Sequence, residues 1–328
     1  MPALNKEKPL SIIPGLCPYP IMQLPLGRIG ERVSQVPKEK LISMVQTLFQ
    51  GHDKRLIEEL IEDLPNGWER FDDVALLPLN AFSHKKWNGI DHSSLWAEIS
   101  NALNVNRLFR KGEITGERRE SSTELLHGTN VDVERIEHGV KFVYRITECM
   151  FSQGNLNERK RMGDLDLSKE EILDLYAGIG YYTLPMLVRG NAKHVTATEW
   201  NPNALRDLRK GLERNGVNER CTVLEGDNRS HGSLLDTKFD RIILGLLPQA
   251  WDGLDTAMRA LRSSGGILHV HGVASTKNPG EWENEVTRKL FKYGRSITKS
   301  GSLRIKSYAP FWDHRVLDIE VGPLSSDS

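Results

Sequence analysis

The chain has 328 residues, a length typical of about two domains. Hydrophobic residues make up 38% of it and charged residues 27%, which supports a packed core and excludes a disordered chain. Its 44 basic and 44 acidic residues cancel, so a protein that binds nucleic acid by bulk positive charge is excluded, whereas a local basic face is not.

The cysteines and the apolar stretches indicate the cellular compartment that we expect for the protein. No stretch is long enough for a membrane helix, and prolines interrupt the apolar stretch at the N-terminus, so we expect no membrane association and no secretory signal. Cys17, Cys149 and Cys221 are far apart and lack C-x-x-C spacing. We therefore expect an intracellular, cytoplasmic protein without a disulfide framework or a zinc site. The sequence sets no oligomeric state, and a monomer is compatible with it.

The first half of the chain predicts an irregular mixture of helices and strands. Its first 20 residues or so are rich in proline and indicate an arm. Helical spacing of apolar residues predicts a helix over 38–62, interrupted at Gly51, and a short strand follows over 71–78. Another helix begins at a cap formed by Ser93 or Ser94, and residues 104–150 alternate strand-like runs with charged turns.

From about residue 168 strands and helices alternate. The pattern predicts strands over residues 170–178, 193–200, 221–227, 239–248 and 265–274. It predicts helices over residues 181–190, 202–216, 251–265 and 279–294. Two final strands, 302–310 and 314–322, have no helix between them. This order predicts an α/β fold with a doubly wound, mainly parallel sheet that ends in an antiparallel hairpin.

The change of pattern divides the chain into three predicted segments. Residues 1–65 form an N-terminal arm and a helical segment of unassigned role. Residues 66–163 form a smaller α+β domain, and residues 164–328 form the α/β domain.

A glycine loop follows the first strand of the predicted sheet. Residues 174–180 read DLYAGIG, with glycines at Gly178 and Gly180. Glycine lets the backbone approach a ligand closely, and open α/β sheets bind ligands at the carboxyl ends of their strands. The loop matches neither the G-x-x-x-x-G-K-[ST] pattern of phosphate loops nor the G-x-G-x-x-G pattern of dinucleotide sites.

Polar residues end the first three strands in order: Asp174, then Glu199, then Asp227 with Asn228. Together with the glycines they resemble an S-adenosylmethionine site. Asp174 would lie near the amino acid end of the ligand, Glu199 would accept hydrogen bonds from the ribose hydroxyls, and Asp227 and Asn228 would meet the adenine edge. Each residue alone is explained by a turn, a solvated strand end or a cap. A nicotinamide dinucleotide is the alternative cofactor, and the glycine pattern suits its pyrophosphate less well.

Most of the chain resembles one family of tRNA-modifying transferases. The resemblance runs from about Phe71 to the C-terminus and includes CMFSQGNLNERKRMG over 149–163, LDLYAGIGYYTLP, GEITGERRESSTELLHGTN and the final KSYAPFWDHRVLDIEV. The family contains tRNA guanine-N1 methyltransferases that act next to the anticodon and aminocarboxypropyl transferases of wybutosine synthesis. It implies a Rossmann-like class I S-adenosylmethionine-dependent methyltransferase fold with a smaller N-terminal α+β domain that positions tRNA.

Two motifs separate the branches of this family. The methyltransferases have a phenylalanine-serine-proline-arginine-leucine motif before the sheet and an asparagine-leucine-proline motif after its fourth strand. Here residues 151–155 read FSQGN and residues 245–248 read GLLP, so Gly154 and Gly245 replace both polar groups. That pattern resembles the aminocarboxypropyl branch. It implies transfer of the 3-amino-3-carboxypropyl group of S-adenosylmethionine to C7 of 4-demethylwyosine in tRNA(Phe), with release of methylthioadenosine.

The resemblance also implies individual contacts. Carried over position by position, the expected cofactor contacts are Ser152, Arg159, Glu199, Asp227 and Asn228. Arg159 stands where the branch usually has lysine, and the two side chains are not equivalent at a bidentate site. No residue is identified as catalytic, because positioning decides which carbon reacts. Asn155 and Pro248 are candidate pocket residues, and Gln249 replaces a serine of the family.

Basic residues in two clusters are candidates for phosphate contacts to tRNA. One cluster contains Arg107, Arg110, Lys111, Arg118 and Arg119, and the other contains Arg159, Lys160 and Arg161. Acidic neighbours make solvated faces with local ion pairs the alternative interpretation. Trp87 beside His84, Lys85 and Lys86 is a candidate for base stacking. Either Tyr181 or Tyr182 is a candidate to line the pocket.

Histidines His269, His271 and His314 lack an evident partner for a metal site, so we expect structural or pocket histidines and no metal. Two further functions are weighed against aminocarboxypropyl transfer. One is guanine-N1 methylation of the same tRNA, against which the two glycines argue. The other is a non-catalytic RNA-binding scaffold, which would have no need for the intact set of glycine and acidic residues.

Overall fold

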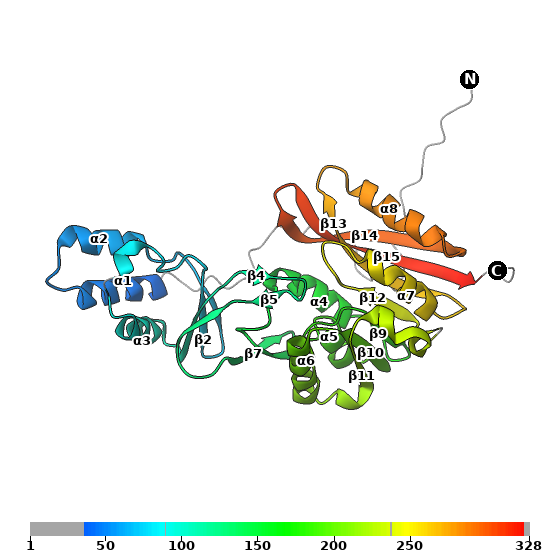
Figure 1. Ribbon diagram of the computed structural model, residues 1–328, viewed down its shortest axis with the longest axis horizontal. Coiled ribbons are helices and arrows are strands. Elements are labelled where there is room, and N and C mark those ends of the chain that lie inside the picture. Colours follow the sequence, from blue (N-terminus) through cyan, green and yellow to red (C-terminus); the bar gives the residue numbers. More distant parts are fainter. Residues whose placement is uncertain (1–35, 89, 237, 325–328) are drawn as a thin grey trace, which may run out of the picture. The chain divides into compact units, whose positions relative to one another are not determined.

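The chain folds into two compact units. The computed structural model describes residues 36–324 except residues 89 and 237. Among these, the N-terminal unit comprises residues 36–135 and 143–151, and the C-terminal unit comprises residues 136–142 and 152–324 (Figure 1). This division differs from the predicted segments, because residues 152–163 belong to the C-terminal unit. The predicted proline-rich arm and Cys17 lie outside the described residues.

Helices α1 (Val36–Leu48), α2 (Lys54–Glu62) and α3 (His92–Leu103) enclose the core of the N-terminal unit, which contains Leu41, Leu60 and Leu95. The predicted interruption at Gly51 is confirmed, since this residue has a φ of 97° between α1 and α2. The predicted serine cap of α3 is wrong. Asp91 precedes both serines and accepts hydrogen bonds from the backbone N–H groups of Ser93 and Ser94 at 3.2 and 3.4 Å, so the helix begins one residue after it.

Strands of the N-terminal unit form a four-stranded sheet in the order β1 (Glu69–Phe71), β2 (Val74–Leu77), β3 (Arg107–Arg110) and β6 (Glu124–His127). Only β2 and β3 in this sheet pair in parallel. Strands β4 (Ile114–Thr115) and β5 (Glu120–Ser121) pair with each other, as do β7 (Asp132–Glu137) and β8 (Val140–Arg145), whose residues 136–142 belong to the C-terminal unit. The predicted α+β character of this half is confirmed.

A seven-stranded sheet forms the centre of the C-terminal unit, in the order β11-β10-β9-β12-β13-β15-β14. The first five positions are occupied by parallel strands β11 (Cys221–Glu225), β10 (His194–Glu199), β9 (Glu171–Asp174), β12 (Arg241–Leu244) and β13 (Gly266–Ser275). Strands β15 (Trp312–Leu324) and β14 (Arg295–Ala309) add an antiparallel hairpin. Both the parallel sheet and its terminal hairpin are as predicted.

Alternation along the strands sorts their side chains between two faces. On one face, Leu268 and Val270 of β13 pack with helices α7 (Leu254–Ala260) and α8 (Pro279–Phe291). On the other face, His269 and His271 of β13 are buried on the side of α4 (Leu156–Gly163). Helices α5 (Thr183–Val188) and α6 (Pro202–Asn215) complete the layers. No helix among residues 36–324 has both the length and the apolar character needed to cross a bilayer.

Candidate cofactor site

The glycine loop after β9 adopts a backbone that only glycine takes readily. Gly178 and Gly180 have φ angles of 57° and 96°. A Cβ on Gly180 would lie 2.7 Å from Leu184 Cγ, and one on Gly178 would lie 2.6 Å from the ring of Tyr181. The loop therefore packs directly under the first turn of the following helix, which places the backbone N–H groups at the carboxyl edge of the sheet.

Glu199, at the end of β10, fixes this loop to the neighbouring strand. Its Oε2 accepts a hydrogen bond from Gly178 N at 2.7 Å, and its Oε1 accepts from Trp200 N at 2.9 Å and Asn201 N at 2.8 Å. Burial raises the pKa of the carboxyl, and the three backbone donors oppose that shift. A carboxylate oxygen has a second lone pair, so this geometry leaves acceptor capacity for ligand hydroxyls.

Asp174 is fully buried at the end of β9, and both of its carboxylate oxygens accept hydrogen bonds from other residues of the protein. Its Oδ2 accepts from Thr183 Oγ1 at 2.8 Å, and its Oδ1 accepts from Tyr176 N at 3.3 Å. Burial raises the pKa of Asp174 to about 6. The carboxyl thus holds the glycine loop to the start of α5.

Asp227 and Asn228 follow β11. Asp227 caps the next 3-10 segment and forms a bidentate ion pair with Arg229, with contacts of 2.5 to 3.0 Å that lower the pKa of Asp227. Asn228 is 6% exposed, and its Nδ2 donates to Leu175 O at 3.3 Å. Within the described part of the chain its Oδ1 has no hydrogen-bond donor. A buried acceptor of this kind suits the exocyclic amine of an adenine.

Ser152 and Arg159 stand on the segment that precedes and forms α4. Arg159 is buried, and it donates to both carboxylate oxygens of Glu137 at 2.6 and 2.9 Å and to Ser152 O at 2.9 Å. This guanidinium therefore holds the backbone of Ser152. A 3-10 turn, Gln153–Asn155, follows Ser152 and ends at Asn155. The Oδ1 atom of Asn155 is a second buried acceptor without a donor among the described residues.

Lys306 of β14 was not singled out from the sequence, although its KSYAP motif was. Its Nζ donates to Ser152 Oγ at 2.6 Å. A Cβ on Gly154 would lie 2.5 Å from Lys306 Cδ. Gly245, the other glycine that separates the branches, faces the ring of Tyr182, since its Cβ would lie 3.0 Å from Tyr182 Cε2. Both glycines thus accommodate large side chains of the same unit.

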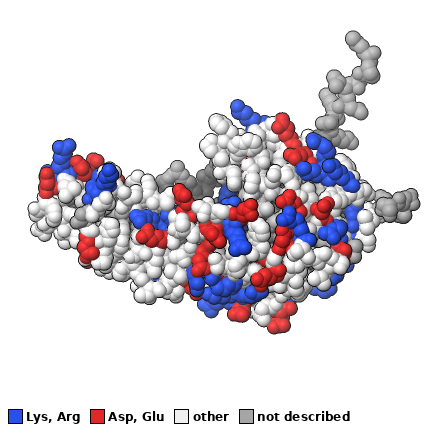
Figure 2. Space-filling view, viewed as in Figure 1, with Lys and Arg blue, Asp and Glu red and all other residues white. Residues whose placement is uncertain are grey.

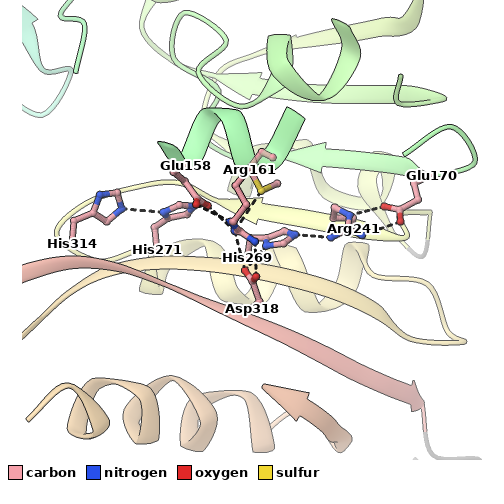
Figure 3. Close-up of polar contacts among 9 residues, drawn as sticks. Glu158, Arg161, Glu170, Arg241, His269, His271, His314 and Asp318 are labelled. Atoms are coloured by element: carbon pink, nitrogen blue, oxygen red, sulfur yellow. Dashed lines mark hydrogen bonds and ion pairs between the residues drawn. The ribbon is translucent and has the colours of Figure 1, made fainter. Parts of the chain in front are cut away.

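A largely buried polar row joins α4 to the sheet (Figure 3). Its buried members are Glu158, Asp318, His269 and Arg241, and its partly exposed members are Arg161 and Glu170. Arg161 donates to Glu158 at 2.7 and 2.8 Å and to Asp318 at 2.7 Å. Arg241 donates to Glu170 at 2.6 and 2.9 Å and lies 2.7 Å from His269 Nε2. Because α4 directly follows Ser152, this row fixes the candidate site to the sheet.

His271 and His314 lie at the end of this row (Figure 3), with Nδ1 of the first 3.0 Å from Nε2 of the second. Burial lowers the pKa of each to about 3, so both rings are neutral near pH 7. Tyr182 stacks on His271 with ring centroids 4.9 Å apart. No group of three or more possible metal ligands occurs among the residues that the structure describes.

Three of the candidate RNA contacts are corrected by the structure. Arg159 and Arg161 are held by carboxylates inside the unit, so of the second basic cluster only Lys160 is exposed, and it pairs with Asp164. Trp87 is 1% exposed and donates to Asp63 at 2.7 Å, which excludes base stacking in this conformation. In the first cluster Arg118 and Arg119 are exposed, whereas Arg107 and Arg110 pair with Asp73 and Glu124. Figure 2 shows basic and acidic residues interspersed over the viewed face.

Comparison with known proteins gives matches along most of the chain. Residues 133–294 match the TRM5/TYW2 methyltransferase domain, and residues 51–131 match the TYW2 N-terminal domain. The tRNA wybutosine-synthesizing protein 2 homolog of Danio rerio is 36% identical over 324 residues, with 87% of this chain and 78% of that protein covered. The tRNA wybutosine-synthesizing protein 2/3/4 of Arabidopsis thaliana is 38% identical over 297 residues, and the chain spans only 29% of its length.

A solved structure agrees with these sequence matches. The protein in the crystal structure of Pyrococcus horikoshii TYW2 in complex with MeSAdo is 30% identical in sequence, and the TM-score is 0.71. The match covers 86% of this chain and 99% of that chain. The Rossmann-like methyltransferase fold predicted from the sequence is thereby confirmed. The chain belongs to the tRNA wybutosine-synthesizing protein 2 family.

Proposed function

We propose that this protein transfers the 3-amino-3-carboxypropyl group of S-adenosylmethionine to C7 of 4-demethylwyosine, next to the anticodon of tRNA(Phe). The observation that carries the proposal is the pair of glycines, Gly154 and Gly245, at the positions that separate the two branches. The space in front of them is filled by Lys306 and Tyr182. An arginine or asparagine side chain at either position would displace these residues, which argues against a guanine-N1 methyltransferase site.

The polar groups at the strand ends fit S-adenosylmethionine. We assign the adenine edge to Asn228 and Asp227, because Asn228 Oδ1 is a buried acceptor without a donor in the described residues. We assign the ribose to Glu199, which lies at the end of the adjacent strand and keeps acceptor capacity. Gly178 and Gly180 provide the close backbone approach, and Asp174 orders their loop. The relative crystallised with MeSAdo, the methylthioadenosine that such a transfer would release, supports this choice of ligand.

The amino acid end of the ligand would lie toward Ser152. The side chain of Ser152 faces the same unit's β14, and its backbone is held by Arg159. Asn155 and Pro248 remain our candidates for the pocket of the acceptor base. Pro248 is exposed and follows a cis peptide bond, and its carbonyl accepts from Val273 N at 2.9 Å at the end of β13.

The chemistry requires positioning more than a strong base. The bound sulfonium supplies an electrophilic carbon, so that a bond from C7 forms as the carbon–sulfur bond breaks, its electron pair goes to sulfur, and C7 then loses its proton to solvent. Three carbons are attached to the sulfur, and the one that lies in line with C7 is transferred. Residues that orient the aminocarboxypropyl chain therefore decide the product.

The acceptor and the compartment are part of the same proposal. The names of the relatives refer to tRNA and wybutosine synthesis. A base beside the anticodon lies in a loop, from which it can be unstacked at small cost. We propose a cytoplasmic enzyme that acts on tRNA(Phe).

A product assay tests the proposal. Phenylalanine tRNA that carries 4-demethylwyosine is incubated with the protein and S-adenosylmethionine, and the digested nucleosides are weighed by mass spectrometry. We expect the mass of one aminocarboxypropyl group to be added and methylthioadenosine to appear in equal amount. A gain of one methyl group with S-adenosylhomocysteine would assign the protein to the methyltransferase branch instead. Guanine-bearing tRNA that lacks the tricyclic base is the matched control substrate.

A further inference from the structure

Lys306 lies beside Ser152, the residue that we assign to the amino acid end of the cofactor. Its ammonium donates to Ser152 Oγ at 2.6 Å, and its aliphatic chain passes against Gly154. A Cβ at position 154 would come within 2.5 Å of Lys306 Cδ and 3.2 Å of Nζ. The glycine that marks the aminocarboxypropyl branch is therefore the residue that leaves room for this lysine.

The backbone of Lys306 is held in place by the pairing of β14 with β15. Lys306 on β14 is paired with His314 on β15, which is 1% exposed. His314 contacts His271, and His271 stacks on Tyr182, whose ring lies against Gly245. The pairing of β14 with β15 and side-chain contacts thus connect the two glycines that separate the branches, and Lys306 lies next to one of them.

The charged side chains around Lys306 have defined hydrogen-bond partners. Arg159 and Arg161 direct their guanidinium groups at the protein carboxylates Glu137, Glu158 and Asp318. The ammonium group of Lys306 donates to the hydroxyl of Ser152. A hydroxyl that accepts from an ammonium still has its own proton to donate, so Lys306 and Ser152 together present N–H and O–H donors suited to a carboxylate.

We propose that Lys306 binds the carboxylate of the aminocarboxypropyl group together with Ser152 and is a specificity-determining residue for its transfer. This inference rests on the proposed function. Holding the carboxylate at Ser152 fixes the direction of the chain that is to be transferred, and methylthioadenosine, which lacks this chain, gains nothing from the lysine. The interaction therefore favours the co-substrate over the product.

Titration calorimetry with two ligands tests the inference. Lys306→Met retains the aliphatic chain beside Gly154 and removes the charge. We expect its affinity for S-adenosylmethionine to fall by about tenfold to a hundredfold, as for a charge-assisted hydrogen bond, with the affinity for methylthioadenosine unchanged. Lys299→Met, at an exposed position on the same strand, is the control and should change neither affinity. Equal losses for both ligands, or no loss for either, would overturn the proposal.

A second substitution approaches the same contact from the other side. Gly154→Ala should displace the lysine chain and weaken S-adenosylmethionine binding selectively, and the double variant should bind no more weakly than Lys306→Met alone. Fully additive losses would contradict a shared contact. These readouts do not depend on which group the enzyme transfers. If the wild-type protein were found to transfer methyl groups, the proposed function would fail while the selective loss of binding would still test Lys306.

Discussion

Nδ1 of His269 lies 2.5 Å from Oδ1 of Asp318, at the centre of the buried polar row. Asp318 is ionised, because the neighbouring His269 and Arg161 hold the pKa of its carboxyl down at about 2 against the effect of burial. Burial lowers the pKa of His269, so its ring is neutral and Nδ1 carries the proton that it donates to Asp318. Its Nε2 is then the acceptor for Arg241, which fixes one tautomer.

Removing the charge of Asp318 should destabilise the C-terminal unit. Asp318→Asn leaves the largely buried Arg161 with one carboxylate partner fewer, and we expect the free energy of unfolding to fall by about 3 kcal/mol. Urea denaturation at pH 7 measures this free energy of unfolding. Glu320→Gln, at a partly exposed position on the same strand, should change it little. Because the folded pKa of Asp318 lies below the unfolded one, this stabilisation is present above about pH 4 and is lost as the pH falls toward 2.

The neutral histidine pair predicts a loss of stability in mild acid. An unfolded histidine takes up a proton near pH 6.5, whereas His271 and His314 in the folded protein do so only near pH 3. The unfolded state therefore binds more protons as the pH falls from 6.5, and each histidine contributes a slope of about 1.4 kcal/mol per pH unit. His314→Gln should make the slope between pH 6 and pH 4 shallower by that amount in urea titrations. Identical slopes for the two proteins would refute a neutral His314.

Glu199 should affect both stability and binding. Glu199→Gln provides only one acceptor oxygen for three backbone N–H groups, so we expect the free energy of unfolding to fall by about 1–3 kcal/mol. Affinity for S-adenosylmethionine should fall about tenfold, measured by calorimetry. Glu225→Gln on the adjacent strand end, where the side chain is 64% exposed, is the matched control. Unchanged affinity in Glu199→Gln would remove this residue from the cofactor site.

Asn228 should contribute equally to both ligands that contain adenine. Asn228→Leu removes the buried acceptor, and we expect about tenfold weaker binding of both S-adenosylmethionine and methylthioadenosine. This common loss contrasts with the selective loss predicted for Lys306→Met. The exposed Asn218→Leu serves as control. A loss for S-adenosylmethionine alone would place Asn228 at the amino acid end instead of the adenine.

Arg118 and Arg119 are exposed members of the first basic cluster, and Lys111, which is also exposed, pairs with Glu69. If they contact phosphate, Arg118→Glu with Arg119→Glu should weaken tRNA binding and reduce the slope of log affinity against log salt by about 1 to 2. Filter binding at several salt concentrations measures both quantities. Lys54→Glu, with its side chain 92% exposed on α2, controls for a general change of charge. An unchanged slope would assign the two arginines to a solvated face.

The sequence was sufficient for the features that depend on local pattern. Alternating strands and helices predicted the sheet, and the order Asp174, Glu199, Asp227 predicted which strand ends come together, because parallel strands place their carboxyl ends at one edge. Only the bounds changed: β9 ends at Asp174, before the loop that was included in the predicted strand. The cap of α3 was missed because Asp91 competes with the serines that follow it.

Features that depend on distant partners could not be predicted. Arg161 looked like a surface cation because its partner Asp318 is 157 residues away in sequence. Trp87 looked available for stacking because nothing in its neighbourhood indicates Asp63 as its hydrogen-bond acceptor. Lys306 begins the KSYAP motif, yet its position beside Ser152 follows from the pairing of β14 with β15 and a register shift next to Lys306.

The terminal hairpin β14–β15 has a consequence for biosynthesis of the protein. Lys306, His314 and Asp318 all come from this hairpin, although the glycine loop and the acidic strand ends are complete about 70 residues earlier in the chain. On the ribosome, the five parallel strands are therefore synthesised before the residue that completes the row around Arg161, Asp318. Translation that stops before residue 295 would yield a chain that has the strand ends we assign to the adenosine and lacks Lys306, the residue we propose to orient the group to be transferred.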